Sequence, residues 1–251
     1  MKIDDISGET LDRLNAMSAE ELIVWSFENF GERAAIGTSL QLTGTVIINM
    51  ASRHFKEFRV FTVDTHRLHP ETYEVIKKTE ERYGIKVEKF TPDEATLKSM
   101  LDRFGEYLFF NDRAKQEYCC HVRKVEPNRR AIASLDIWIT GLRNDQSAHR
   151  SQMKKAAIVE EDGRKILKLN PLIEWTVDEV WEYIRERDLP YNVLFDWGFD
   201  SVGCIICSTP LLKGEPPRAG RWRWFNLLKD EDKKECGIHG GDSDADEKEG
   251  D

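Results

Sequence analysis

The sequence predicts an α/β fold in which a mainly parallel sheet is flanked by helices. Strand-like apolar runs alternate with helix-like runs from residue 33 to residue 169, and this alternation is typical of parallel sheets. From about Val193 the periodicity fades, and Gly, Pro, Cys and Trp become frequent. We therefore expect an irregular, cysteine-containing C-terminal cap on the α/β body, followed by a mobile tail.

Two helices are predicted from capping boxes, in which a hydroxyl residue and a glutamate three positions later satisfy free backbone N–H groups. Ser18 and Glu21 form the first box, and that helix should end at Gly31. Thr176 and Glu179 form the second, and that helix should end before Pro190. Both boxes precede apolar residues at helical spacing, so each helix should bury one face.

The remaining elements follow from the alternation of apolar runs. Strands are expected at 33–39, 59–65, 85–90 and 135–141, with another edge strand at 166–169, and helices at 46–55 and 70–83. Ligands of such sheets lie beyond the carboxyl ends of the strands. The loops of interest are therefore 38–44, 64–69 and 141–150.

Length and composition describe a soluble globular chain. It has 251 residues, of which 40% are hydrophobic and 33% charged, enough for an ample core in one large domain. We expect a single domain over residues 1–240, with a cap and arm at about 193–235, and a disordered acidic tail at 241–251. No apolar run is long enough to span a bilayer, and the first nine residues lack a secretion signal, so a cytoplasmic protein is expected.

The formal net charge is −9, and much of the excess is acidic residues after Gly240. This balance argues against nucleic acid and anionic membranes as partners. A small anionic ligand in a local basic pocket remains compatible with it.

The cysteines predict a metal site. Cys119 and Cys120 are adjacent, and after 83 further residues come Cys204 and Cys207 as a C-x-x-C pair. Two close pairs can supply four thiolates to zinc or to an iron–sulfur cluster. Neighbouring side chains diverge, so both thiols could bind one compact ion only if the backbone bent sharply at the tandem pair. A four-iron cube tolerates such a pair more easily than a single ion. The alternative is that Cys119 and Cys120 are buried small hydrophobes.

Cys236 is the remaining cysteine, and its neighbours favour a reactive thiol. Lys233 and Lys234 precede it and His239 follows, and nearby cations lower the pKa of a thiol. Adjacent glycines would allow a mobile arm. An incidental surface cysteine is the alternative interpretation.

Several basic residues stand where they could bind an anion. Arg123 and Lys124 follow the tandem pair, Arg143 and Arg150 lie in the 141–150 loop, and Arg218, Arg221 and Arg223 follow Cys207. Arginines suit bidentate contact with phosphate or sulfate. The hydroxyl-rich loop 38–44 could bind an anion at a helix N-terminus, although an ordinary strand–helix turn is an equal alternative.

Together these motifs resemble the assimilatory adenylyl-sulfate (APS) reductases of the phosphoadenylyl-sulfate reductase family. The resemblance covers roughly residues 20–240. Its motifs are VDTHRLHPET (63–72), CCHVRKVEP (119–127), GLRNDQS (141–147), CIIC (204–207), RAGRW (218–222) and ECGIH (235–239).

The resemblance implies an adenine-nucleotide α-hydrolase-like fold, one [4Fe-4S] cluster, and reduction of APS to sulfite and AMP with thioredoxin as reductant. It implies that the cluster ligands are Cys119, Cys120, Cys204 and Cys207, and that Cys236 is the nucleophile that carries an S-sulfocysteine intermediate. The implied sulfate-binding residues are Lys124, Arg218, Arg221 and His239. The implied nucleotide-binding residues are Val63, Thr65, Gly141 and Arg150, with Ser39 in the phosphate loop and Arg143 as an addition. A homo-oligomer is compatible with the sequence.

The sequence departs from the superfamily in the phosphate loop, which usually reads close to S-x-G-x-D-S. The segment from Ser39 reads SLQLTG and lacks the aspartate that would bind Mg²⁺ in an ATP-splitting relative. His66 also stands where a glycine is common. The alternatives are a reductase that prefers the 3′-phosphorylated substrate PAPS, an ATP pyrophosphatase that thiolates RNA, and a non-enzymatic iron–sulfur or zinc redox sensor.

Overall fold

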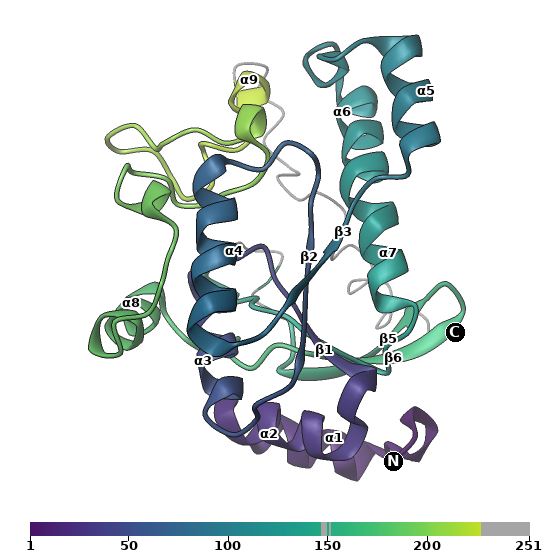
Figure 1. Cartoon of the computed structure of the whole chain (residues 1–251), viewed down its shortest axis with the longest axis vertical. Helices are drawn as coiled ribbons and strands as arrows, with labels where there is room; N and C mark the ends of the chain where they lie inside the picture. Colours follow the sequence, from purple (N-terminus) through teal and green to yellow (C-terminus); the bar gives the residue numbers. More distant parts are fainter. Residues whose placement is uncertain (147–149, 151, 227–251) are drawn as a thin grey trace. The chain divides into compact units, whose positions relative to one another are not determined.

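The computed structural model describes residues 1–146, 150 and 152–226, and the chain divides into two compact units. Unit 1 comprises residues 1–62, 71–88 and 134–192, and unit 2 comprises residues 63–70, 89–133 and 193–251. Figure 1 shows the elements of both units. Each unit is described by itself below.

Unit 1 is built around a six-stranded, mostly parallel sheet in the order β3-β2-β1-β4-β6-β5. β1 pairs in parallel with β2 and β4, β4 pairs in parallel with β6, and β5 is antiparallel to β6. The strands are β1 (Ala34–Gly37), β2 (Arg59–Val63), β3 (Val87–Phe90), β4 (Ile137–Ile139), β5 (Ala156–Glu161) and β6 (Arg164–Leu169). The central strands are buried, which explains their continuous apolar sequences.

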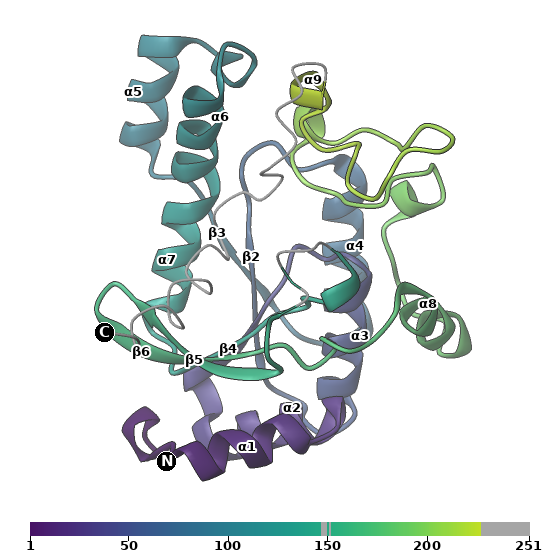
Figure 2. The same ribbon diagram turned by 180° about the vertical axis from the view of Figure 1, so that it is seen from behind.

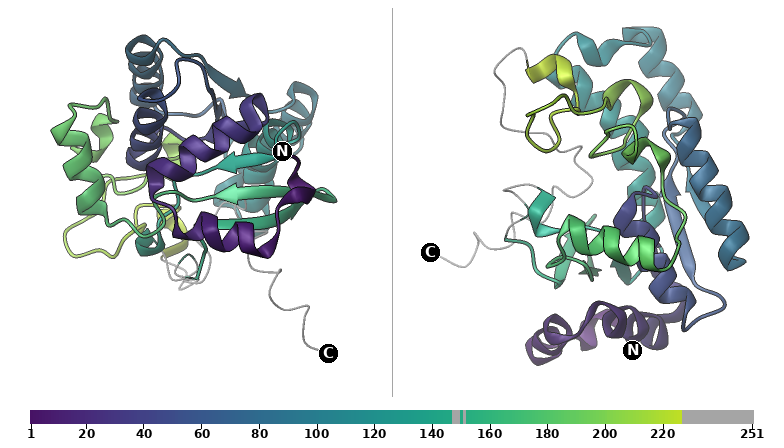
Figure 3. Two further views of the ribbon diagram at one scale, coloured as in Figure 1. Left: turned by 90° about the horizontal axis from the view of Figure 1, so that it is seen from below. Right: turned by 90° about the vertical axis from the view of Figure 1, so that its left-hand side faces the viewer.

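Helices cover the sheet of unit 1. α2 packs against β1 and β4, α1 against β5, and α3 against β1, α2 and α8. Figure 3 shows the purple helices α1 and α2 lying across the strands. The bounds are α1 (Gly8–Ala16), α2 (Ala19–Phe30), α3 (Leu42–Ser52), α4 (Pro70–Tyr83) and α8 (Val177–Glu186). This arrangement confirms the predicted α/β class.

Both predicted capping boxes are present. The Ser18 hydroxyl accepts from the Glu21 N–H, and the Glu21 carboxylate accepts from the Ser18 N–H. Thr176 and Glu179 do the same at the start of α8. Gly31 terminates α2 with φ 53°, a left-handed conformation that glycine adopts at little cost. Local capping chemistry thus sets these boundaries.

The predicted edge strand at 166–169 is wrong in its position. β6 is internal, because β5 pairs with its outer side and forms the edge. β5 was not predicted, since its glutamates obscure the apolar pattern. The hairpin turn consists of Asp162 and Gly163, both at positive φ (50° and 74°). An Asp-Gly pair is typical of such turns and was the signal that could have revealed the strand.

Unit 2 contains a helical segment and an irregular segment. The helices are α5 (Glu94–Phe104), α6 (Arg113–Cys120), a π-helical turn (His121–Val125) and α7 (Glu126–Ile132), and Figure 2 shows α6 and α7 as one continuous rod. From Val193 to Asn226 the chain has only short helical turns, including α9 (Arg223–Asn226), and isolated bridges. This confirms the predicted irregular character, whereas the predicted tail lies outside the described residues.

No helix in the described part of the chain combines the length and the apolar character that crossing a membrane requires.

Candidate functional site

A pocket in unit 2 brings both cysteine pairs together. All four thiols are free and buried. The pocket is small. Its lining consists of Arg67, Phe109, Gln116, Cys119, Cys120, Arg123, Lys124, Cys204, Cys207 and Trp222. Soft thiolate donors and several cations therefore surround one small space.

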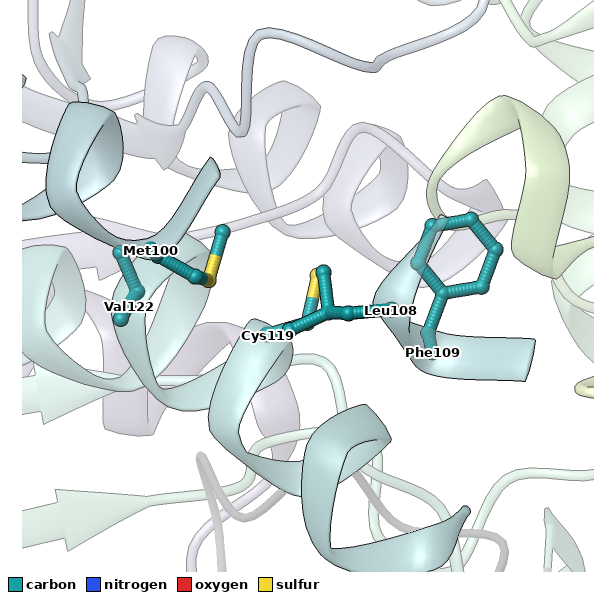
Figure 4. Packing of buried hydrophobic residues seen from close by; sticks show 5 residues of the cluster. All are labelled: Met100, Leu108, Phe109, Cys119 and Val122. Carbon is teal, nitrogen blue, oxygen red and sulfur yellow. The ribbon is translucent and has the colours of Figure 1, made fainter. Parts of the chain in front are cut away.

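The tandem cysteines diverge without a bend. The helix runs through Cys119 and Cys120 and continues as the π-helical turn, so the backbone lacks the sharp bend that a single compact ion would require. Cys119 packs with Met100, Leu108 and other apolar side chains (Figure 4). Cys120 belongs to a second cluster, with both C-x-x-C thiols, Trp222 and Phe225. The two thiols thus reach the same pocket from two packing environments.

The segment 64–69 is hydrogen-bonded to Arg123, which follows the tandem pair, and to the segment that carries the C-x-x-C pair. Arg123 Nη1, near the tandem pair, donates to the Thr65 carbonyl at 2.8 Å. The Cys204 thiol donates to Thr65 Oγ1 at 3.3 Å, and the Ile205 N–H donates to the Arg67 carbonyl at 2.8 Å. Leu68 and Cys204 also form an isolated β-bridge. This segment therefore links motifs that are distant in the sequence.

Burial and charge act in opposite directions on the thiols. Burial raises the pKa of Cys119, against the charges of Arg123 and Arg67. Burial followed by the charge of Cys204 raises the pKa of Cys207 to about 11. For Cys204 burial is the largest single influence and favours the thiol, but nearby cations, led by Lys124, lower its pKa overall. The pocket is thus built to balance negative sulfur with fixed positive charge.

Arg218 and Arg221 belong to the same unit. Arg218 lies at φ 63°; its N–H donates to Asp200, and its Nη1 donates to Ser201 Oγ at 3.4 Å. Arg221 is buried and stacks on Trp222, with Cζ 4.8 Å from the ring centroid. A Cβ on Gly203 would lie 2.7 Å from Arg221 Cζ. The missing side chain at Gly203 therefore makes room for the guanidinium.

The loops after β1 and β4 contact one another in unit 1. Thr43 Oγ1 donates to the Gly141 carbonyl at 2.8 Å, whereas Ser39 is exposed and accepts from Gln41. Arg143 is buried and donates to both carboxylate oxygens of Asp145, at 2.9 and 3.2 Å, so its charge is used within the loop. Arg150 is buried and donates to Gln146 Oε1.

Several residues of the pocket were not among the predicted site residues. Arg67 lies within the 63–72 motif, which was the available signal, but nothing local marks Gln116, whose amide donates to Cys120 Sγ at 3.1 Å. Arg223, by contrast, was singled out as a basic residue and does not line the pocket. It pairs with Glu215 and donates to the Pro210 carbonyl, so it anchors a loop.

His66 adopts a backbone conformation that glycine favours. Its φ is 59°, in the left-handed region where histidine is more common than most residues. Its N–H donates to Asp64 Oδ1 at 2.9 Å, and this side-chain contact stabilises the turn. The departure from the family motif therefore leaves a glycine-like path through the 64–69 segment.

The donor atoms that line the four-cysteine pocket are of the kind that bind an iron–sulfur cluster. Within residues 1–146, 150 and 152–226, no three His, Cys, Asp or Glu side chains are grouped closely enough to hold a metal ion as they stand. Four buried thiols around one space nevertheless are the donor set of a cubic cluster, whose ligands approach separate corners. Cys236 and His239 lie outside the described residues.

Sequence comparison places the chain among sulfonucleotide reductases. The pattern of the phosphoadenosine phosphosulfate reductase domain matches residues 33–210. An adenosine 5′-phosphosulfate reductase of Pseudomonas aeruginosa is 38% identical over 231 residues, which are 89% of this chain and 83% of that protein. The Allochromatium vinosum enzyme of the same name is 38% identical and covers 80% of this chain and 77% of its own length.

Structural comparison agrees. The phosphoadenylyl-sulfate reductase of Candida auris, solved as a phosphate complex, matches with a TM-score of 0.66 and 28% identity, over 81% of this chain and 98% of that one. The FMN adenylyltransferase of Candida glabrata matches with a TM-score of 0.54 and 13% identity, over 83% of this chain and 68% of that one. The second likeness concerns the fold alone.

Proposed function

The chain belongs to the phosphoadenosine phosphosulfate reductase family, and from that premise we propose that it reduces APS to sulfite and AMP. Family membership makes it an oxidoreductase that acts on a sulfur-containing substrate. The finer choice of APS is supported by the relatives at 38% identity, which are named as APS reductases. It further rests on the observation that four buried cysteines line one pocket of unit 2 together with cations.

The pocket suits a [4Fe-4S] cluster held by Cys119, Cys120, Cys204 and Cys207. The cluster, when bound, would join the four thiolates into one anionic centre. Lys124 is 7% exposed and its charge acts on both Cys204 and Cys207. A cation in that position would offset the negative sulfur that would otherwise repel an anionic substrate.

The first proposed step is attack on the sulfate group of APS. The Cys236 thiolate bonds to the sulfur, and the bond from sulfur to the bridging phosphate oxygen breaks with its electron pair, so AMP leaves and S-sulfocysteine remains. Cations would stabilise the charge that moves to the leaving phosphate. The proposed sulfate-binding residues are Lys124, Arg218, Arg221 and His239. The proposed nucleotide-binding residues are Val63, Thr65, Gly141 and Arg150, with Ser39 in the phosphate loop.

Arg143 was predicted as a further substrate residue, and its contacts favour an indirect role. Both carboxylate oxygens of Asp145 accept from its guanidinium, and Asp145 Oδ2 also accepts from the Val177 N–H at 3.2 Å. We therefore assign Arg143 to shaping the loop that carries Gly141 and Arg150.

The second proposed step transfers two electrons from a dithiol protein such as thioredoxin. One of its thiolates attacks Cys236 Sγ, and the bond to the sulfonate breaks with its electron pair, which releases sulfite. Its second thiol resolves the mixed disulfide and regenerates Cys236. Two successive reactions suit a nucleophile that meets two partners. We propose that both units act as one cytoplasmic reductase domain over residues 1–240.

Preference for PAPS is the second candidate, favoured by the likeness to the Candida auris PAPS reductase. Comparison of kcat/KM for the two nucleotides separates the alternatives. We expect a higher value for APS, and a higher value for PAPS would reverse the assignment of substrate while leaving the family intact.

The decisive experiment is anaerobic incubation with ³⁵S-APS in the absence of any thiol reductant. We expect one label on the peptide that contains Cys236, release of AMP, and release of labelled sulfite when reduced thioredoxin is added. Cys236→Ser should bind as much iron as the wild type but acquire no label and show no turnover. An active Cys236→Ser variant would sink the covalent mechanism.

A further inference from the structure

Arg123 is a buried cation that the proposed chemistry does not use. It lies in the π-helical turn three residues after Cys120, and only 3% of it is exposed. A buried guanidinium requires partners, because isolated charge is unfavourable away from water. The partners of Arg123 come from three separate parts of unit 2.

The first partner is the 64–69 segment, since Arg123 Nη1 donates to the Thr65 carbonyl at 2.8 Å. The others are thiols. Arg123 interacts with the charges of Cys119, from the tandem pair, and of Cys204, from the C-x-x-C pair. Its Nε is buried and has no hydrogen-bond acceptor among the described residues. One planar group thus binds the backbone of the 64–69 segment and lines the pocket that both cysteine pairs line.

The shape of guanidinium matters for this arrangement. Its five N–H groups point in fixed directions in one plane, so it can serve a carbonyl and sulfur acceptors at once, whereas a lysine ammonium acts as a compact point charge on a flexible stem. Arg67, the neighbouring arginine, is used differently. It bonds to the Glu106 carbonyl and carboxylate and lies over Phe109, with Cζ 5.2 Å from the ring centroid.

We propose that Arg123 is a positioning residue that holds the two cysteine pairs in register around one cluster, by binding the Thr65 carbonyl from within the pocket that both pairs line. This inference rests on the proposed function, because it concerns the cluster that the four cysteines would hold. Arg123 acts through the cysteines and the 64–69 segment and touches no reacting atom in this scheme.

The test compares three variants prepared anaerobically with the wild type. Arg123→Met removes both the positive charge and the planar guanidinium. Arg123→Lys keeps the charge and removes the guanidinium. Arg129→Met is the matched control, because Arg129 lies on α7, six residues further along the same continuous helix, and is exposed. Iron and sulfide content, the rate of iron release to a chelator, and the Mössbauer spectrum are measured, with circular dichroism recorded in parallel.

We expect both Arg123 variants to release iron faster than the wild type by about 10- to 100-fold, the range typical when an outer partner of a metal ligand is removed. The Mössbauer spectrum of iron-loaded Arg123→Lys should differ from that of the wild type, and Arg129→Met should match the wild type in both measurements. If Arg123→Met fails to fold, Arg123→Lys decides the question.

Three results would overturn the inference. A wild-type rate of iron release and a wild-type Mössbauer spectrum in Arg123→Lys would show that charge alone matters. Equal rates of iron release from Arg123→Met and Arg129→Met would show that Arg123 does not hold the cluster. Iron release that simply follows loss of the circular dichroism signal would reveal a general stabilising role. Wild-type protein without iron and sulfide is a distinct outcome, because it removes the proposed cofactor itself and the inference with it.

Discussion

Single residues of the pocket are placed by close packing as much as by charge. Gly203 precedes Cys204, and its N–H donates to Ser208 Oγ at 2.8 Å. A side chain at this position would collide with the Arg221 guanidinium. The sequence motif identified Arg221 and both cysteines of the C-x-x-C pair, but it contained no sign that a glycine makes room for the arginine.

Gly203→Ala tests this arrangement. The new methyl group should displace the Arg221 guanidinium, and misplacement of a substrate-positioning group by about 1 Å can reduce the rate about 100-fold. We expect kcat/KM for APS to fall by up to about 100-fold, while iron content stays unchanged. Gly8→Ala is the control, because a Cβ there meets nothing within 4 Å. Unaltered kcat/KM in Gly203→Ala would remove Arg221 from the proposed site.

Tyr83 offers a test of buried polarity in unit 1. Its hydroxyl accepts from Asn49 Nδ2 at 3.2 Å, and Tyr183 donates to Asn49 Oδ1 at 2.9 Å. Burial raises the pKa of Tyr83. The unfolded chain therefore loses this proton first, near pH 10. The contribution of Tyr83 to stability is complete below that pH and is lost as the pH rises through the folded-state pKa.

Tyr83→Phe should accordingly lower the free energy of unfolding by about 0.5–1.5 kcal/mol at neutral pH. The difference from the wild type should shrink above about pH 10, where the wild type alone loses this contribution. Urea unfolding at a series of pH values measures it. Tyr107→Phe, which alters a side chain that is 60% exposed, is the control. A difference in the free energy of unfolding that grows with pH would reverse the assigned direction of the pKa shift of Tyr83.

Whole elements were predictable where local chemistry defines them. The helix 70–83 and the start of α8 follow from periodicity and capping, and the structure has both. α3 begins at Leu42, four residues before the predicted start, because its first turn contains Thr and Gly and lacks an apolar stripe. The edge strand β5 was missed because its glutamates obscure the apolar pattern, although the Asp162-Gly163 turn was a local signal for the hairpin.

Ser18→Ala measures how much the capping box contributes to α2. The substitution removes the hydroxyl that accepts from the Glu21 N–H at 3.3 Å, so the free energy of unfolding should fall by about 1 kcal/mol. Ser99→Ala is the matched control, because Ser99 is exposed within α5, where alanine is the better helix former. A loss in Ser99→Ala equal to that in Ser18→Ala would show that the capping hydroxyl has no special role.

The molecule as a whole determines what no single motif could. The tandem cysteines and the C-x-x-C pair predicted four thiols at one site, and both pairs line the same pocket of unit 2. Their connection through Thr65 and Leu68 was not predictable, because it joins residues far apart in the sequence, in part through backbone groups that any residue carries. Cys119 and Cys120 diverge because one helix runs through both, whereas no residue pattern predicted the π-helical turn that follows them.

The division of the chain into two units leads to a prediction for the loss of the proposed cluster. Metal binding supplies folding free energy to the ligands it joins, and all four cysteines belong to unit 2. Anaerobic removal of iron with a chelator should therefore increase hydrogen exchange in peptides from α6 and the π-helical turn. Peptides from β1 and β4 should keep their protection, because local opening can occur without global unfolding. The iron-saturated chelator is the control.

Hydrogen exchange followed by mass spectrometry distinguishes the possible results. Equal loss of protection in α6 and in β4 would mean that the units unfold together. Unchanged protection in iron-depleted protein would mean that apolar packing alone holds the pocket, as the clusters around Cys119 and Cys120 could allow. We expect the selective result, because a pocket lined by three basic side chains is electrostatically unfavourable once the anionic centre that balances it is removed.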